Sequence, residues 1–180
     1  EVETINQLFN VAWALGTQPL PRGNRVALTT NAGGAAALAA DSLAFNGFEL
    51  ARISPEIQQK LRTRLNPSAQ VSNPVDMLGS VSPEDYLWSL ENLDADEGVD
   101  VLLPILVPQA LVDTLGVANA WSEIGKKTKK TILTCLMGER STLESEQCLN
   151  MAGVPVYAFP DEAGRVLKGM EQYKQLADKP

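Results

Sequence analysis

Apolar residues gather in short runs along the chain, and longer amphipathic segments separate these runs. The runs predict five strands, at residues 25–30, 48–53, 99–107, 131–136 and 154–158. Between them, apolar residues recur at helical spacing and predict helices at residues 2–15, 34–45, 54–65, 82–94, 110–124 and 142–151 and from residue 160 onward. The run at 99–107, VDVLLPILV, is apolar throughout, as is typical of a strand that helices cover on both faces.

This alternation predicts a three-layer α/β domain with a five-stranded parallel sheet. We expect right-handed crossovers and the flavodoxin-like strand order 2-1-3-4-5. The domain is predicted to span residues 24–180, preceded by a helix and a stiff linker at residues 1–23. In this order the topological switch point lies beside the first strand, so a ligand is expected where that strand ends.

The first strand ends in a glycine turn, NAGG, that leads into an alanine-rich helix. Such a turn presents unpaired backbone N–H groups and the positive end of a helix dipole, which suits a phosphate. Glycine also lets an anion approach closely and makes a positive φ accessible. The alternative is a tight turn that needs glycine for packing alone. The candidate phosphate-binding residues are Asn31, Ala32, Gly33, Gly34 and Ala35.

The charge balance disfavours two classes of partner. The formal net charge is −7 and the pI is about 4.6, whereas nucleic acids and anionic membranes require clustered cations. The one basic run, GKKTKK at residues 125–130, is interpreted as a turn-like, solvated loop. No apolar stretch approaches 18 residues and no signal peptide is visible, so we expect a cytoplasmic protein.

The chain contains no histidine, which excludes a Ser-His or Cys-His dyad and an imidazole base. No cluster of Cys, Asp or Glu has the spacing of a metal site, and Cys135 and Cys148 are interpreted as reduced packing residues. We therefore predict no catalytic residue and no metal or cofactor bound by this chain alone. Because the sequence begins with Glu1, it is expected to be a piece of a longer protein or a processed product.

Three further residues are candidates for the edge of a site. Asn73 and Asp76 belong to an Asn-Pro-Val-Asp loop, which predicts either a turn capped by its polar side chains or the rim of an active site. Gln109 follows the third strand and so falls on the ligand side of the sheet, although a residue in this position more often starts a helix than contacts a ligand.

Several motifs resemble one family when they are taken in order. These motifs are GNRVALTTNAGGAAALAADSL, VSNPVDMLGS, LVPQA, CLMGE and AGVPVYAFPDEA. The chain resembles the second flavodoxin-like domain of NDP-forming acyl-CoA synthetases, which include the ADP-forming acetyl-CoA synthetases and succinyl-CoA synthetase-like enzymes. The same module occurs in Pat-type protein acetyltransferases. The turn CLMGE adds Gly138 to the candidates at the site's edge.

The resemblance implies a reaction and a set of partner domains. The family converts acyl-CoA, NDP and phosphate into the acid, CoA and NTP through an acyl phosphate and a phosphohistidine. The helix that begins near Gly34 would help to cradle the phosphoryl group on that histidine. The histidine, the CoA-binding domain and the ATP-grasp domain would lie outside this chain, with CoA, ADP or ATP, and Mg²⁺ used by the parent enzyme. The isolated chain is then expected to be folded but inactive.

The chain departs from the family pattern at two turns. The family's usual turn NAGGPG is altered here, because Ala35 and Ala36 replace its last two residues. The family's usual turn MGG carries Glu139 as its last residue here, and this carboxylate would repel a phosphate.

Two alternative functions stay open. One is a non-catalytic scaffold or regulatory domain of a Pat-type acetyltransferase, and the other is an independent nucleotide-, flavin- or phosphoacceptor module. A receiver domain is disfavoured, because the first strand ends without acidic residues.

Overall fold

The structure, a computed structural model, describes residues 2–138 and 141–177. The strands formed by these residues are β1 (Arg25–Thr30), β2 (Glu49–Leu50), β3 (Val75–Asp76), β4 (Val101–Leu106), β5 (Thr131–Ile132), β6 (Thr134–Leu136) and β7 (Val156–Tyr157). The helices are α1 (Ile5–Thr17), α2 (Gly33–Phe45), α3 (Pro55–Arg62), α4 (Pro83–Ala95), α5 (Thr114–Lys127), α6 (Leu143–Met151) and α7 (Pro160–Ala177).

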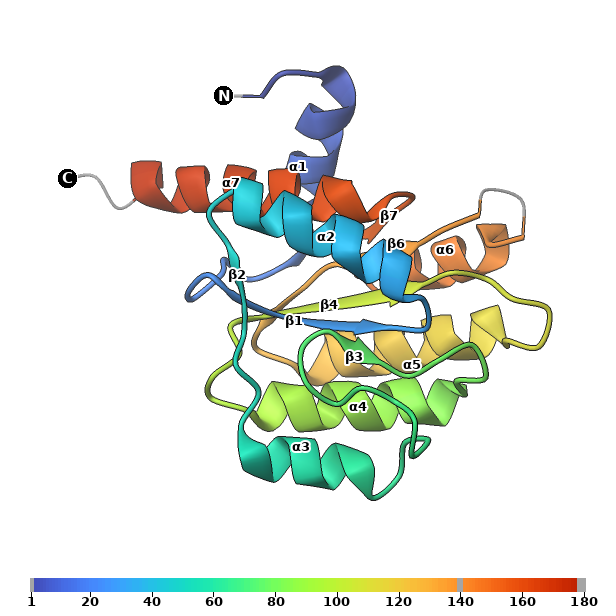
Figure 1. Cartoon of the computed structure of the whole chain (residues 1–180). Helices are drawn as coiled ribbons and strands as arrows, with labels where there is room; N and C mark the ends of the chain where they lie inside the picture. Colours follow the sequence, from blue (N-terminus) through green and yellow to red (C-terminus); the bar gives the residue numbers. More distant parts are fainter. Residues whose placement is uncertain (1, 139–140, 178–180) are drawn as a thin grey trace.

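A parallel sheet lies between two layers of helices, which confirms the predicted α/β class (Figure 1). Helices α1, α2 and α7 cover one face, while α3, α4 and α5 cover the other. Every residue of β4 is buried, as the unbroken apolar run predicted. No helix of the described residues is long and apolar enough to cross a membrane.

The described residues form seven strands, so the prediction of five was wrong. The continuous path is β2-β1-β4-β6-β7, while β3 pairs with β1 and β5 pairs with β4 off this path. The predicted strand at 131–136 is divided at Leu133 into β5 and β6. This break lies opposite the middle of β4, where Pro104 has no N–H to contribute to the ladder. The predicted strand at 48–53 is also shorter, because β1 changes partner from β2 to β3.

The side chain of Asn73 fills the gap at this change of partner. Its Nδ2 donates to the carbonyl oxygens of Val26 (2.7 Å) and Ala51 (3.0 Å), and its Oδ1 accepts from the Leu28 N–H at 3.0 Å. The side-chain amide thus bridges the backbone of β1 and the residue that follows β2, as a neighbouring strand would do. It provides an acceptor for the Leu28 N–H and a donor for the Ala51 carbonyl, and it adds a second donor to the Val26 carbonyl, which also accepts from the Ala51 N–H at 2.8 Å.

Helix α2 packs closely because small residues line its contacts. Ala35, Ala36 and Ala39 are buried against the sheet and its neighbours. Further along α2, Gly164 of α7 lies so close to Ser42 that a Cβ at position 164 would be 2.6 Å from the Ser42 carbonyl oxygen. This close packing fixes the direction of α2 and hence the place of its N-terminus.

An ion pair joins the amino ends of β1 and β4. Asp100 accepts hydrogen bonds from the backbone N–H of Arg25 (3.1 Å) and from its guanidinium group (2.8 and 2.9 Å). The Asp100 side chain is nearly buried, whereas that of Arg25 is partly exposed. These charge-assisted bonds set the register at one end of the central strand pair.

We predict that Asp100 makes folding stability depend on pH. Hydrogen bonding from Arg25 lowers the pKa of Asp100, and desolvation opposes this with a smaller effect. A carboxyl group of this kind stabilises the fold above its unfolded pKa of about 4, and this contribution is lost as the pH falls through the folded value. In urea unfolding, Asp100→Asn should therefore be less stable than the wild type at pH 7, and the difference should shrink in acid.

The matched control is Glu56→Gln, which removes an exposed carboxylate that pairs with Lys60 within α3. It should change the unfolding free energy little at any pH, since exposed pairs contribute little. Equal stability of Asp100→Asn and the wild type at pH 7 would contradict the assigned role.

Candidate functional site

The buried amide of Asn31 ties the carboxyl ends of β1 and β4 together. Its Nδ2 donates to the Val107 carbonyl oxygen at 2.8 Å, and its Oδ1 accepts from the Val107 N–H at 2.9 Å. The residue is 4% exposed. Both polar groups of the side chain are thus used within the protein, so any contribution of Asn31 to phosphate binding is indirect.

Two backbone N–H groups remain open at the start of α2. The Ala32 N–H donates to Thr30 Oγ1 at 3.0 Å, and the Ala35 N–H donates to the Ala32 carbonyl oxygen at 3.1 Å. By contrast, the N–H groups of Gly33 and Gly34 have no hydrogen-bond acceptor among the described residues. The N-cap residue, Ala32, has no side chain that could accept from them. Of the five residues predicted to bind phosphate, Gly33 and Gly34 are thus the two whose backbone N–H groups remain open among the described residues.

The two glycines provide room rather than an unusual backbone. Neither is among the glycines with positive φ, so the left-handed conformation that glycine makes accessible is not used at this turn. A Cβ at Gly34 would meet nothing within 4 Å, and a Cβ at Gly33 would lie 3.1 Å from Asp76 Oδ2. The backbone at Gly34 thus faces open space into which an anion could fit.

The loop after β3 comes to the same edge of the sheet. Asp76 lies beside Thr30 in the parallel register, and its Oδ1 accepts from the Leu78 N–H at 3.0 Å. One residue further on, a Cβ at Gly79 would overlap with the side-chain oxygen of Gln109. Asp76 and Gln109 are therefore brought to the edge that carries the glycine turn.

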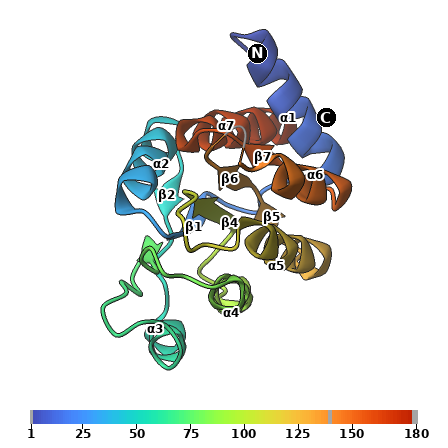
Figure 2. The ribbon, with the colours of Figure 1, turned by 90° about the vertical axis from the view of Figure 1, so that its right-hand side faces the viewer.

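Gly138 completes this edge from the turn after β6. It has a φ of +109°, and a Cβ there would lie 3.4 Å from Pro108 Cγ. Glu139, the departure from the family pattern, lies outside the described residues. The residues that the structure brings together are thus 31–34, 76–79, 107–109 and 138, on the side that faces the viewer in Figure 2. Asn73 is the exception among the candidates, since it lies between β1 and β2 further from the edge.

The side chain of Tyr86, in α4, is hydrogen-bonded to β4 close to this edge. Its hydroxyl donates to the Ile105 carbonyl oxygen at 2.7 Å, and the ring is buried. Burial, with a contribution from the nearby charge of Asp76, raises the pKa of Tyr86 well above its ordinary value, so the hydroxyl stays neutral. Sequence reasoning missed Tyr86 and Thr30, because each acts through a backbone partner that only the fold reveals.

Other charged groups offer no comparable site. Within residues 2–138 and 141–177, no group of three His, Cys, Asp or Glu residues is placed to hold a metal. In the basic run, Lys127 pairs with Glu123, and Lys130 donates to the carbonyl oxygens of Leu93 and Asp96. The run is therefore not wholly the solvated loop that was predicted, because residues 125–127 form the end of α5 and Lys130 is half-buried against these carbonyls.

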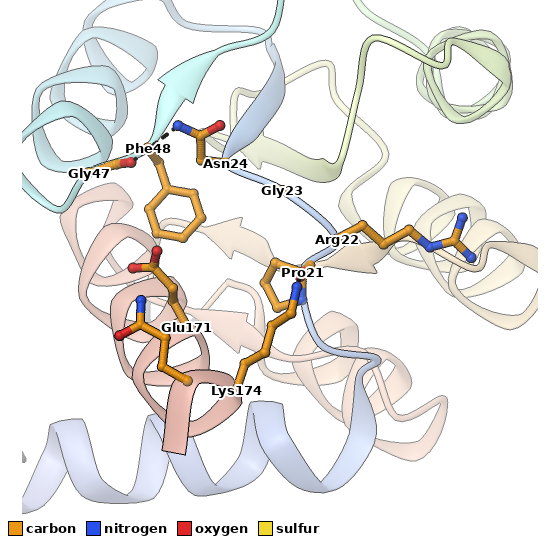
Figure 3. A pocket seen from close by; sticks show the side chains of 9 residues that line it. Pro21, Arg22, Gly23, Asn24, Gly47, Phe48, Glu171 and Lys174 are labelled. Atoms are coloured by element: carbon orange, nitrogen blue, oxygen red, sulfur yellow. Dashed lines mark hydrogen bonds between the residues drawn. The ribbon is translucent and has the colours of Figure 1, made fainter. Parts of the chain in front are cut away.

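A separate pocket of about 370 Å³ lies at the amino end of β1 (Figure 3). It is bounded by the segment 21–24, the Gly47–Phe48 turn and the last turns of α7. Lys174 crosses it and donates to the Pro21 carbonyl oxygen at 2.9 Å. Since parallel α/β sheets bind ligands at their carboxyl edge, this pocket is not the expected site.

The fold and the edge define a class of protein: a doubly wound α/β domain with an uncapped helix N-terminus beside its first strand, an arrangement suited to an anion. Residues 26–177 match the ligase-CoA domain. The chain belongs to this family.

Several ADP-forming ligases are similar to the chain. The alpha subunit of acetate–CoA ligase [ADP-forming] II from Pyrococcus furiosus is 34% identical over 94% of this chain and 38% of that protein. Acetate–CoA ligase [ADP-forming] I from Archaeoglobus fulgidus is 34% identical over 99% of this chain and 25% of that protein. The crystal structure of PH0766 from Pyrococcus horikoshii superimposes with a TM-score of 0.92 at 32% identity, covering 99% of this chain and 42% of that one. The chain thus spans less than half the length of each of these three proteins.

Removing the Asn31 amide tests the connection between β1 and β4. Asn31→Ala leaves the N–H and carbonyl of the half-buried Val107 without these partners, which should cost about 1–3 kcal/mol of unfolding free energy. Asn31→Asp should not restore stability, because a carboxylate would face the Val107 carbonyl. Urea denaturation measures the unfolding free energy of both variants, and Asn6→Ala, at an exposed position, is the control. A loss in Asn31→Ala no larger than that of the control would contradict the role given to the amide.

Proposed function

We propose that this chain is one domain of an NDP-forming acyl-CoA synthetase and supplies the α2 N-terminus that cradles a histidine-borne phosphoryl group. The observation that carries the proposal is the pair of free N–H groups at Gly33 and Gly34, at the switch point of the sheet. Membership of the ligase-CoA family and the similarity to ADP-forming acetate–CoA ligases support it.

The proposed cradle consists of neutral donors, which suits a group that must be released again. Each charge-assisted hydrogen bond to an anion is worth about 1.5–3 kcal/mol, and desolvation and ordering offset much of this at an open site. For the isolated chain, the affinity for free phosphate is therefore expected to be millimolar at best. In the parent enzyme, a second domain would close over the phosphoryl group and strengthen the same bonds.

The remaining machinery would come from outside the chain. The sequence of 180 residues contains no histidine, so the phosphorylated residue must belong to another domain. A CoA-binding domain and an ATP-grasp domain would bind CoA, ADP or ATP, and Mg²⁺. We accordingly infer that the isolated chain folds but does not turn over acyl-CoA.

The two alanines that depart from the family turn are compatible with the cradle. Ala36 is 2% exposed, so its methyl group points into the interior and leaves the space before α2 free. The Ala35 N–H is bonded to the Ala32 carbonyl and adds no donor. The altered turn therefore retains the two donors on which the proposal rests.

Gly34→Val in the full-length synthetase tests this function. A side chain there would enter open space and block an anion while touching nothing else within 4 Å at its Cβ. We expect phosphohistidine formation and turnover to fall at least about a hundredfold, as when an oxyanion donor is lost. The melting temperature should change little.

The matched control is Gly47→Val, after the C-terminus of α2. Gly47 has a φ of +87°, which a β-branched residue adopts only with strain, so stability should fall by about 1 kcal/mol or more while turnover per folded molecule persists. Undiminished turnover in Gly34→Val, or a loss that merely follows unfolding, would show that the glycine turn has a packing role alone.

A further inference from the structure

We infer that the outer face of α1 is an interface on which another domain of the same synthetase polypeptide docks. The inference rests on the proposed function, since it takes the chain to be one domain of a longer enzyme. It goes beyond that function because it assigns a surface that the phosphoryl site does not include.

The outer face of α1 is a continuous apolar stripe. Its residues recur at i, i+3, i+4, i+7, i+8 and i+11, which is the spacing of one helix face. The α1 stripe consists of exposed apolar residues and one exposed glycine, namely Ile5, Leu8, Phe9, Ala12, Trp13 and Gly16. Its four large side chains are between 41% and 73% exposed. Single apolar side chains are common on protein surfaces, whereas a contiguous patch of them marks a place of contact.

The opposite face of α1 has its partners within the domain. Val11 and Ala14 are buried, and a Cβ at Gly169 of α7 would lie 2.7 Å from Val11 Cγ2. The Tyr157 hydroxyl donates to the Asn10 carbonyl oxygen at 3.3 Å. The α1 stripe is therefore not a core face that has come loose, and the helix is apolar on two sides. A helix of this kind is normally covered on both.

The segment after α1 fixes the helix to the domain, so the stripe is held in one orientation. Gln18 Nε2 donates to the Gly153 carbonyl oxygen at 2.7 Å, and Gln18 Oε1 accepts from the Ile132 N–H at 3.1 Å. The Thr131 hydroxyl donates to the Pro19 carbonyl oxygen at 2.8 Å. The first turns of α1 project beyond α7 in Figures 1 and 2. A rigid surface of this kind docks at a low cost in conformational entropy.

The longer relatives indicate what covers the stripe. The ligase-CoA match covers residues 26–177, so α1 and its linker lie outside it. The similarity to the Archaeoglobus fulgidus ligase nevertheless covers 99% of this chain, which includes α1, and only 25% of that protein. PH0766 superimposes over the same 99% of this chain. Helix α1 thus recurs in the longer polypeptides without being part of the matched domain, as an element between two domains would.

Charge and area argue against two other occupants. Residues 1–21 include no Lys or Arg, whereas a helix that lies on a membrane carries cations on its polar face. Two copies of the chain, each with a formal net charge of −7, would repel one another. One pair of 13-residue helices also buries less than the roughly 1,200–2,000 Å² of a stable complex. Interfaces between domains of one polypeptide are smaller, because the covalent linkage holds the partners together.

Maleimide labelling of cysteine variants of the full-length synthetase tests the docking. Leu8→Cys and Ala12→Cys place thiols in the α1 stripe, and the matched control Gln59→Cys places one on the exposed side of α3. Rates are read on each peptide by mass spectrometry and normalised to the urea-unfolded protein. Both stripe positions should react at least about tenfold more slowly than the control, because labelling requires the docked surface to open. A stripe position that is not protected relative to the control would overturn the proposal.

A photo-crosslinker identifies the occupant. With p-benzoylphenylalanine in place of Phe9, irradiation of the full-length protein should join position 9 to a peptide of the same molecule that lies outside this chain. Crosslinks between two copies of α1, or protection from maleimide that is lost on dilution, would show that a second copy covers the stripe and would overturn the assigned occupant.

Neither measurement requires turnover, so the docking and the proposed function can fail separately. An unprotected stripe in a protein that forms phosphohistidine and turns over acyl-CoA overturns the docking and leaves the function standing. A stripe that is protected and crosslinked within a protein that does neither supports the docking and overturns the function.

Discussion

The hydrogen-bonded pair formed by the Asn31 amide and the Val107 backbone is the constraint on which the site depends. It joins β1 and β4 at the point where both chains leave the sheet. The glycine turn and α2 continue from one partner, and the Pro108-Gln109 segment continues from the other. Arg25 and Asp100 hold the same strands at their amino ends. Because hydrogen bonds hold β1 and β4 together at both ends, the open N–H groups, Asp76 and Gln109 take fixed positions relative to one another.

Much of the fold follows from local patterns in the sequence. Apolar runs alternating with amphipathic segments were sufficient to predict an α/β domain, and the helix starts predicted at residues 54 and 82 agree with the N-caps Ser54 and Ser82 of the structure. The short strand β3 was beyond this reasoning. It has two residues, and it exists because β1 lies beside it and not because of its own propensity.

The site was predictable in location and less so in chemistry. The switch-point rule indicated the end of β1, where the structure has two free N–H groups. The partners of the two asparagines were not predictable, because Asn31 and Asn73 both bond to backbone groups far away in the sequence. An amide that completes a sheet and an amide that binds a ligand look the same in a sequence. Only the partners Val107, Val26 and Ala51 distinguish them.

The central claim is that the N–H groups of Gly33 and Gly34 receive a phosphoryl group, and amide chemical shifts report on it directly. In ¹⁵N-labelled protein titrated with inorganic phosphate, we expect the largest downfield amide proton shifts at Gly33 and Gly34. Smaller changes should follow at residues 76–79, and the lysines at 126–130 should be unaffected. Shifts centred on those lysines or on the pocket beside Lys174, with none at the glycine turn, would contradict it.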